Sequence, residues 1–374
     1  HRPPLQFMEM RVVELQIEDV AFGGKGVGRA EGKVVFVPFT IDGERIAARI
    51  TREKKHFAEA QLDQVLDASA HRAQPECPYF GSCGGCSYQH ISYEHQLELK
   101  QRQVDQLLRR IGRFNDARVQ QIVASPKSYG YRNRVTVHVE NGVIGYYRRD
   151  VHQLIDVEVC PIAGPAVNRA LAELRARHPR AGHYTLRASP RRRVFEQTND
   201  EVADALAHFI ASFLPAQQHL LVDAYCGAGF FAKKLLDRFE RVVGIEWDRY
   251  AVAAAQQTAT AKETYIAGDV DAILAGQLAG ADFATTAVIV DPPGTGLTGA
   301  TRRILLAHPV GTLIYVSCNP ATLARDLADL RQRFTIKSVL PLDMFPQTAE
   351  IECAVHLVPT DSAQASILRQ RSSA

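Results

Sequence analysis

The chain of 374 residues is too long for one small hydrophobic core, and its 46% hydrophobic and 23% charged residues are typical of a globular protein of two or three domains. No apolar run approaches the roughly 18 residues of a membrane helix. Seven unevenly clustered cysteines do not fit a secreted disulfide scaffold, so we expect no signal peptide, no membrane contact and a cytoplasmic location. Net charge is +3, but residues 1–200 hold 30 Lys and Arg against 23 Asp and Glu, whereas residues 201–374 hold 14 against 18. A basic front half suits the binding of a polyanion.

Residues 9–67 predict an all-β module of four or five short strands, because hydrophobic alternation is interrupted there by Gly-rich turns. Cations and aromatic rings lie in or near the predicted loops: Lys25, Arg29, Arg52, Lys54, Lys55, Phe22, Phe36 and Phe57. A small β-barrel of this composition is typical of an RNA-binding surface. The alternative is an ordinary barrel whose aromatic rings fill the core.

The middle region combines turns, a helix and further β structure. Residues 75–90 are rich in turns and cysteine, and residues 93–112 have helical spacing. Residues 129–150 predict a hairpin that turns at Asn141-Gly142. A helix around 163–178 and a strand pair near 183–198 follow. The arginines of this region are candidate phosphate contacts, or else a solvated basic face: Arg132, Arg134, Arg148, Arg149, Arg191, Arg192 and Arg193.

From Leu220 onward, strands alternate with helices, which predicts a doubly wound, mainly parallel sheet. The expected strands are 220–224, 241–246, 264–267, 287–291, 311–317, 337–341 and 353–358. Ligands of such sheets bind at the carboxyl ends of the strands.

Acidic residues close four successive strands of this sheet: Asp223, Glu246, Asp269 and Asp291. Gly227 and Gly229 follow the first strand, where glycine lets the backbone approach a ligand at a helix N-terminus. Glu246 is placed to bind the two hydroxyls of a ribose. This arrangement resembles the S-adenosylmethionine (SAM) pocket of class I methyltransferases. A dehydrogenase is the alternative, but the residues after Gly229 do not supply its third glycine.

The stretch "YVSCNP", residues 315–320, puts Cys318 at the end of a predicted buried strand. The thiol is either core packing or a nucleophile. A thiolate that adds to C6 of a pyrimidine lets C5 attack a sulfonium methyl, and a base must then remove the C5 proton. Glu350 and Glu352 alternate with apolar neighbours, so we expect both carboxylates on one face of a strand. Gly294 follows Asp291-Pro292-Pro293 where amino-methyltransferases generally have an aromatic residue, which favours a carbon acceptor.

The motifs "CPYFGSCGGCSYQH", "YRNR", "FEQTN", "DAYCGAG", "DPPGTG", "SCNP" and "DMFPQT" occur in this order. Together they resemble the RNA uracil-C5 methyltransferase family over roughly residues 9–359. The resemblance implies a TRAM β-barrel (1–68), a central α+β region that holds an iron–sulfur cluster and binds RNA (69–200), and a class I SAM-dependent α/β methyltransferase domain (201–374). It also implies a monomer that flips its target uridine out of the stack.

The resemblance assigns roles to individual residues. Cys318 is similar to the nucleophile, and Glu352 matches the proton-abstracting base. Positions around SAM and the target base are matched by Gln197, Tyr225, Glu246, Asp269 and Asp291, in addition to the two glycines. Two residues depart from the family pattern. Gly294 stands where Arg is common, so that loop's contact with substrate is not implied. Glu350 stands where His is common, which leaves a second candidate carboxylate besides Glu352.

Cys77, Cys83 and Cys86 have C-x5-C-x2-C spacing, and Cys160 lies beyond the predicted hairpin. Four thiolates on turn-rich backbone suit a metal or iron–sulfur centre. Structural zinc and unpaired buried thiols are the alternatives. The resemblance makes Cys160 the fourth ligand of a 4Fe–4S cluster with a structural or RNA-folding role. We expect the remaining cysteines, Cys226 and Cys353, to pack in the interior.

The resemblance favours 23S rRNA as substrate, because a TRAM barrel together with a cluster is typical of the bacterial ribosomal branch. The alternative is the T-loop of tRNA, since archaeal tRNA enzymes can carry both features. Cytosine-C5 methylation uses the same thiolate chemistry, but its RNA enzymes carry different cysteine motifs. A non-catalytic RNA-binding or folding factor is an alternative of another class, which the intact Cys318 and Glu352 disfavour.

Overall fold

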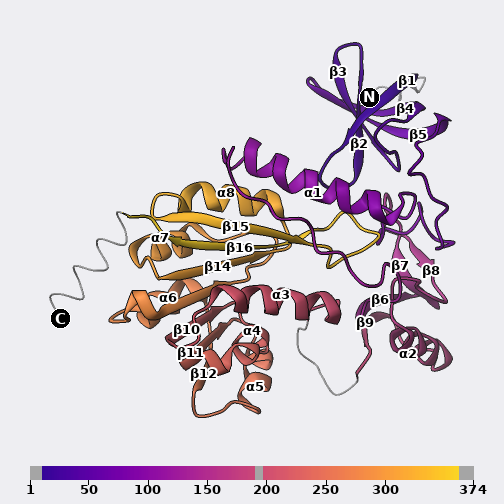
Figure 1. The fold of residues 1–374 in the computed structure, drawn as a ribbon. Helices are drawn as coiled ribbons and strands as arrows, with labels where there is room; N and C mark the ends of the chain where they lie inside the picture. The colour runs from indigo at the N-terminus through magenta and orange to yellow at the C-terminus, as the bar shows by residue number, and fades with distance from the viewer. Residues whose placement is uncertain (1–10, 190–196, 362–374) are drawn as a thin grey trace, which may run out of the picture.

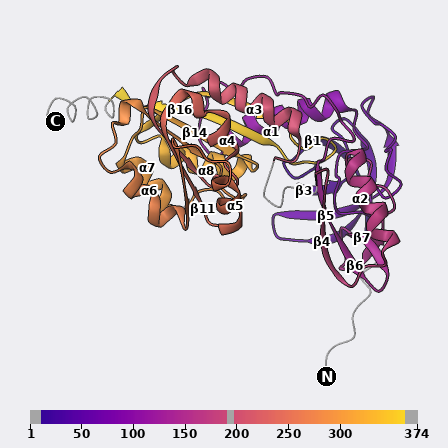
Figure 2. The same ribbon diagram turned by 90° about the horizontal axis from the view of Figure 1, so that it is seen from below.

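The computed structural model describes residues 11–189 and 197–361. These residues form three separate sheets: a closed five-stranded barrel, an antiparallel four-stranded sheet and a seven-stranded sheet flanked by helices (Figure 1). The barrel and the four-stranded sheet lie at one end of the molecule and the seven-stranded sheet at the other (Figure 2). The structure therefore has the expected class I α/β fold with an N-terminal barrel. None of the described helices is long and apolar enough to cross a membrane.

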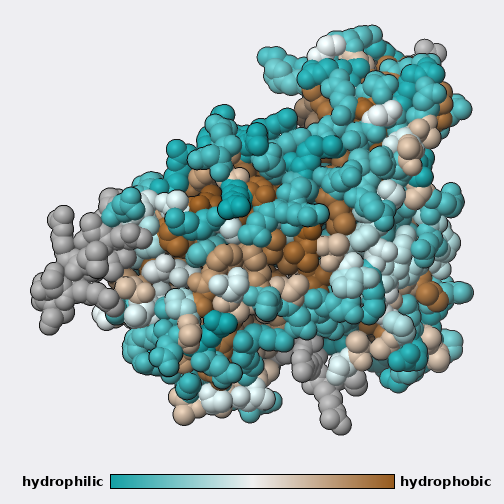
Figure 3. All heavy atoms as spheres, viewed as in Figure 1, coloured by the Kyte–Doolittle hydropathy of each residue, from teal (hydrophilic) through white to brown (hydrophobic). Residues whose placement is uncertain are grey.

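The barrel is formed by five strands in the order β1-β2-β3-β5-β4. Their bounds are β1 Val12–Val20, β2 Lys25–Ala30, β3 Lys33–Pro38, β4 Arg45–Glu53 and β5 Phe57–Asp67. Alternate residues such as Leu15, Ile17 and Val37 fill its core. Phe36 and Phe57 lie outside this core, with ring centroids 5.8 Å apart in an edge-to-face contact. Hydrophilic residues cover much of the visible surface of the barrel (Figure 3).

The four-stranded sheet has the order β8-β7-β6-β9, and α2 packs against one of its faces. The bounds are β6 Arg134–Glu140, β7 Val143–Tyr147, β8 Leu154–Asp156, α2 Pro165–Ala176 and β9 Gly182–Arg187. Asn141 and Gly142 connect β6 to β7 with φ values of 50° and 82°, which confirms the predicted hairpin turn. Of the strand pair expected near 183–198, only β9 forms within the described residues, and residues 190–196 lie outside them.

The seven-stranded sheet has the order β12-β11-β10-β13-β14-β16-β15, with β16 antiparallel to both of its neighbours. Its strands are β10 Gln218–Ala224, β11 Phe239–Glu246, β12 Glu263–Ala267, β13 Thr286–Val290, β14 Thr312–Ser317, β15 Phe334–Leu342 and β16 Glu352–Pro359. Its helices are α3 Asp200–Phe213, α4 Phe230–Lys234, α5 Arg249–Gln256, α6 Val270–Leu278, α7 Gly299–Ala307 and α8 Pro320–Leu330. All seven predicted strands are present. A hydrophobic core lies on each face of the sheet, because its strands are apolar on both sides.

The chain between the barrel and the four-stranded sheet packs on the seven-stranded sheet. Helix α1 (Tyr93–Arg110) contacts α8 and β15, and Val104 and Leu108 belong to the core on that face. The segment after α1 then runs parallel to β15 through bridges between Val119 and Val339 and between Val123 and Leu342. Residues from the predicted central region thus support the outer edge of the methyltransferase sheet.

Candidate active site and cysteine pocket

A cavity of about 980 Å³ lies at the carboxyl ends of the parallel strands, where ligands of open α/β sheets bind. Most of the predicted site residues line it: Gln197, Tyr225, Gly227, Glu246, Asp269, Asp291, Cys318 and Glu352. These residues come from seven separate stretches of chain. The arrangement brings the candidate nucleophile, the candidate base and the candidate SAM contacts to one site.

Cys318 lies at the turn from β14 into α8. All six residues of β14 are buried, but Cys318 is exposed. Asn319 caps α8 by accepting hydrogen bonds from the backbone N–H groups of Ala321 and Thr322. The Nδ2 group of Asn319 also donates to the carbonyl of Gly294 at 3.0 Å, which fixes the loop after β13 beside the thiol. A Cβ on Gly294 would stand 3.8 Å from the Cys318 sulfur, so glycine leaves space next to the thiol.

Glu352 is the first residue of β16 and is 3% exposed. Ser317 pairs with Cys353 in the antiparallel ladder of β14 and β16, so the next positions, Cys318 and Glu352, lie at the same level. Burial raises the pKa of Glu352 well above its usual value, and the carboxylates of Asp291 and Glu350 add to this effect. A buried carboxyl level with the thiol is suited to accept a proton there.

Glu350 has a different environment from Glu352. It precedes β16, so the prediction that both carboxylates share a strand face was wrong. Its side chain is 59% exposed and lies 3.8 Å from the Arg132 guanidinium. The Thr348 hydroxyl accepts from the Glu350 N–H at 3.2 Å, so Glu350 belongs to the turn that comes before the strand.

The loop after β10 forms the wall of the cavity on the side of Glu246. Tyr225 adopts φ 65° and Gly227 φ 53°, both in the left-handed region. The Gly227 N–H donates to Glu246 Oε2 at 3.0 Å, and the Asp248 N–H donates to Oε1 at 2.8 Å. These two bonds hold the carboxylate at the end of β11, where its remaining lone pairs are available to hydroxyl donors.

Gly229 and Asp223 stabilise this loop without lining the cavity. Gly229 is not among the residues that line the cavity; a Cβ there would lie 2.6 Å from the Tyr265 hydroxyl, so glycine is needed for packing. Asp223 is fully buried and accepts from the Ala232 N–H at 3.0 Å. Burial raises the pKa of Asp223 to about 8. Of the four acidic residues at strand ends, Asp223 therefore stabilises the loop, while the other three line the cavity.

Asp291 and Asp269 differ in burial. Gln197 Nε2 donates to Asp291 Oδ2 at 3.4 Å, and burial raises the pKa of Asp291 to about 7. Asp269 caps α6 by accepting from the Asp271 N–H at 3.0 Å. The cavity also contains residues that the sequence reasoning missed: Thr198, Trp247, Asp248, Ala251, Gly268, Val270, Pro292, Pro293 and Phe345. Trp247, directly after Glu246, is 75% exposed. An aromatic residue at that position in the sequence could have been identified as a candidate ligand contact.

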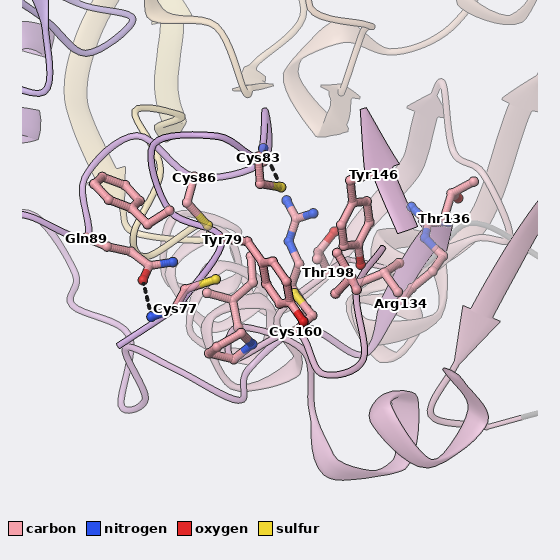
Figure 4. Close-up of a pocket in the computed structure, with 17 residues that line it drawn as sticks. Cys77, Tyr79, Cys83, Cys86, Gln89, Arg134, Thr136, Tyr146, Cys160 and Thr198 are labelled. Atoms are coloured by element: carbon pink, nitrogen blue, oxygen red, sulfur yellow. Dashed lines mark hydrogen bonds between the residues drawn. The ribbon is translucent and has the colours of Figure 1, made fainter. Parts of the chain in front are cut away.

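The four cysteines of the N-terminal half line a second cavity, of about 400 Å³ (Figure 4). Cys77, Cys83 and Cys86 come from the loop before α1, and Cys160 comes from the turn after β8. Hydrogen bonds fix their backbone: the Cys77 N–H donates to Gln89 Oε1 at 3.1 Å, and the Cys160 N–H donates to Asn168 Oδ1 at 2.9 Å. Thr198 lines this cavity and the active-site cavity, so the two are adjacent.

Among the described residues, no group of three or more His, Cys, Asp and Glu side chains is arranged to hold a single metal ion. Burial raises the pKa of Cys86 to about 12 and also raises the pKa of Cys77 and Cys83. A positive metal centre is therefore needed if these groups are to be thiolates.

The candidate phosphate-binding arginines are dispersed. Arg132 is 26% exposed, lines the cysteine pocket and lies 5.8 Å from the centre of the Phe345 ring. Arg149 donates to the carbonyl of Cys86 at 2.5 Å, which ties it to the cysteine loop. Arg191, Arg192 and Arg193 lie outside the described residues.

Comparisons with known proteins show the family of the chain. Residues 6–62 match the TRAM domain family, and residues 274–360 match the family described as tRNA (Uracil-5-)-methyltransferase. An uncharacterized RNA methyltransferase of Bdellovibrio bacteriovorus is 31% identical, with 92% of this chain and 94% of that protein covered. The chain belongs to the RNA (uracil-5-)-methyltransferase family. A relative from Nostoc, also named an uncharacterized RNA methyltransferase, is 28% identical with coverage of 94% and 97%.

Membership of this family makes the chain a SAM-dependent RNA methyltransferase that acts on uracil, as the motifs predicted. Among solved structures, the tRNA (uracil-54, C5)-methyltransferase of Pyrococcus abyssi in complex with S-adenosyl-L-homocysteine matches the fold with a TM-score of 0.69. The match covers 92% of this chain and 100% of that chain at 22% sequence identity. The whole described arrangement of barrel, small sheet and methyltransferase sheet is thus a known fold.

Proposed function

We propose that this chain forms 5-methyluridine in 23S rRNA, with Cys318 as nucleophile and Glu352 as base. The observation that carries the proposal is that an exposed thiol and a buried carboxyl with raised pKa line one cavity. Glu246 and Asp291 line the same cavity at the ends of β11 and β13, the two strands that flank β10. SAM supplies an electrophilic methyl group on a sulfonium, and Glu246, Gly227 and Asp269 are the residues that would hold its adenosyl part.

The proposed reaction has three steps. The Cys318 thiolate forms a bond to C6 of the uracil, and the C5=C6 electrons move into an enolate. C5 then forms its bond to the methyl group as the sulfur–methyl bond breaks. Glu352 takes the C5 proton, the C5=C6 double bond reforms and the bond from sulfur to C6 breaks. The thiolate is regenerated, and Glu352 must lose its proton before the next turnover.

The electrostatics of the cavity favour a cation. Burial, and after it the negative charges of Glu352, Asp291 and Glu350, raise the pKa of Cys318 to about 11. The same carboxylates attract a positive charge, and a cation bound among them lowers the pKa of every acidic group in the cavity. Binding of the sulfonium therefore favours the ionised forms of both Cys318 and Glu352.

Two classes of RNA are candidate substrates. The TRAM barrel and the four-cysteine pocket support 23S rRNA through the family resemblance. The description of the matched methyltransferase family and the fold of the Pyrococcus enzyme favour tRNA as the second candidate. Mapping 5-methyluridine in 23S rRNA and in tRNA from cells that lack this gene distinguishes them: loss from tRNA alone overturns the ribosomal proposal.

We also propose that the cysteine pocket holds a 4Fe–4S cluster ligated by Cys77, Cys83, Cys86 and Cys160. The support is that four sulfurs from two separated segments line one cavity of about 400 Å³. A cluster would crosslink the two segments, and it takes no part in methyl transfer.

The test of the catalytic roles uses variants that stop at different steps. Cys318→Ala should neither methylate RNA nor become linked to it. Glu352→Gln should add its thiolate and transfer the methyl group, and then accumulate a methylated protein–RNA complex that migrates slowly on a denaturing gel. Glu350→Gln is the matched control, because this carboxylate is exposed, and turnover should survive. Normal methylation by Cys318→Ala would overturn the nucleophile, and a complex trapped only by Glu350→Gln would reassign the base.

A further inference from the structure

The four-stranded sheet presents one face to α2 and the other face to solvent. Val135, Val137, Val139 and Leu186 point into the core beneath α2. The alternate residues on β6 and β9 point the opposite way, and Thr136, His183 and Thr185 among them are exposed. This second face and the loop after β7 hold aromatic and basic side chains that methyl transfer does not use.

Four rings form a continuous row on this open face, which we call the ring row: His183, His138, Tyr147 and His152. The centroids of His183 and His138 are 4.5 Å apart, those of His138 and Tyr147 are 4.5 Å apart, and those of Tyr147 and His152 are 4.1 Å apart. The rings of Tyr147 and His152 are nearly parallel, at 21°. The row therefore crosses β9, β6 and β7 and ends on the following loop.

One ring of the row is held by a hydrogen bond: the Tyr147 hydroxyl donates to Glu140 Oε1 at 2.6 Å. His138 Nδ1 is buried and has no hydrogen-bond partner among the described residues. Burial and the neighbouring His183 lower the pKa of His138, which favours a neutral ring at neutral pH. Neutral, pre-positioned rings are well suited to stacking.

Two arginines occupy the other end of the same face. Arg134 and Arg187 are opposite each other in the β6–β9 ladder, four residues along β6 from His138. At a rise of about 3.3 Å per residue, the arginine pair and the ring row are about 13 Å apart. Arg132, two residues before this end, reaches Glu350 beside the active-site cavity at 3.8 Å. Along this face, the arginines therefore lie nearer to the catalytic centre and the ring row lies farther from it.

We propose that the ring row is a stacking platform for unpaired nucleotides that flank the target uridine. Sheets that read single-stranded RNA stack two or three bases on rings of this kind, including His, while cations hold the phosphates. The direction of the RNA rests on the proposed function, since it places the target at Cys318. The platform itself rests only on the rings and the arginines.

The test compares ring-removing and ring-keeping variants. The probe is a short single-stranded oligoribonucleotide of mixed sequence that carries 2-aminopurine, with a duplex of the same sequence as a second probe. Tyr147→Ala and His152→Ala should each weaken binding of the single strand by about 5- to 100-fold, the effect of losing one stacked base. The same two variants should no longer quench the fluorescence of 2-aminopurine. Tyr147→Phe and His152→Phe should bind normally, and binding of the duplex should not change.

His219→Ala is the matched control, because His219 is also exposed but pairs with Glu240 on the distant methyltransferase sheet. His152 lies on a loop and is exposed, so its variant protects the test against misfolding of Tyr147→Ala. The platform is overturned if the ring-removing variants bind the single strand normally, or if they lose binding of single strand and duplex equally. Normal binding of the single strand would indicate that this face binds a protein partner instead. Ring-dependent binding by a protein that methylates no RNA would preserve the platform and overturn the proposed function instead.

Discussion

Cys318 is accessible from the cavity, yet its surroundings disfavour the thiolate that the proposed reaction needs. Burial of the sulfur is the largest cause of its pKa of about 11, followed by the negative potentials of Glu352 and Asp291. The position just before α8 acts in the opposite direction, because a helix N-terminus favours an anion. The resting enzyme is therefore expected to hold a protonated thiol at neutral pH, which protects it from oxidation and alkylation.

This expectation predicts how Cys318 reacts with iodoacetamide, followed by mass spectrometry of its peptide. Below the pKa, the thiolate fraction and hence the rate should rise about tenfold per pH unit, with no plateau near neutral pH. SAM should raise the rate at fixed pH relative to S-adenosylhomocysteine, because the two fill the same space and only SAM carries a positive charge. Equal rates with the two compounds would contradict activation by the sulfonium.

Glu246 gives a second prediction for a single residue. Glu246→Ala should weaken SAM binding in titration calorimetry by about 2–4 kcal/mol, tens to hundreds of fold, since charge-assisted hydrogen bonds to the ribose are lost. Glu246→Gln should lose less, because the amide oxygen can still accept from the Gly227 or Asp248 N–H and keep the loop in place. An unchanged affinity in Glu246→Ala would remove this residue from the site.

The loop between β15 and β16 is the element that positions Glu352, the proposed base. Lys100 on α1 donates to Asp343 Oδ1 at 2.6 Å and to the carbonyl of Phe345 at 3.0 Å, and both charged side chains are fully buried. Gln96, one turn earlier on α1, donates to Gln347 Oε1 and accepts from the Gln347 N–H, both at 3.0 Å. Helix α1 thus holds the loop at three points before it enters β16 at Glu352.

Removing one member of the buried ion pair should destabilise the protein. Lys100→Met should lower the free energy of unfolding by roughly 3–5 kcal/mol, because the Asp343 carboxylate is left buried without its partner. The double variant Lys100→Met/Asp343→Leu should recover most of this loss in urea denaturation, since no unpaired charge remains. A double variant that is no more stable than Lys100→Met would show that the loop needs the polar contacts themselves.

Structural features that depend on a local sequence pattern could be predicted from the sequence. The parallel strands could be predicted because their residues are apolar on both faces, and the hairpin because Asn141-Gly142 suits a tight turn. Lys100 could not be predicted as buried, because its partner lies 243 residues away in the chain. Glu350 was misassigned because the alternation of acidic and apolar residues already begins at Glu350, whereas β16 begins only at Glu352. The ring row assembles from three separated segments, so no single stretch of sequence reveals it.

At the scale of the whole molecule, the cysteine loop connects the N-terminal half to the catalytic centre. The backbone N–H groups of Ser87 and Tyr88, directly after Cys86, donate to the carbonyl of Gln347 at 3.1 and 3.0 Å. Tyr88 is fully buried in a small core shared by the barrel, α1 and Ala349. The Tyr131 hydroxyl donates to the carbonyl of Pro346 at 2.9 Å from the other side. A crosslink at the cysteines would therefore stiffen the support of the catalytic loop.

This connection predicts the behaviour of protein purified without oxygen. It should be brown, and Cys160→Ser should reduce its iron content as much as Cys83→Ser, because each removes one of four ligands. Cys226→Ala is the matched control and should keep its iron, since Cys226 is buried in the methyltransferase core. Both ligand variants should also unfold at lower temperature, because the segments of Cys83 and Cys160 are no longer joined, while calorimetry should show SAM binding retained in the separate cavity. Anaerobic protein that contains zinc and no iron would overturn the cluster, and iron retained in Cys160→Ser would remove that residue as a ligand.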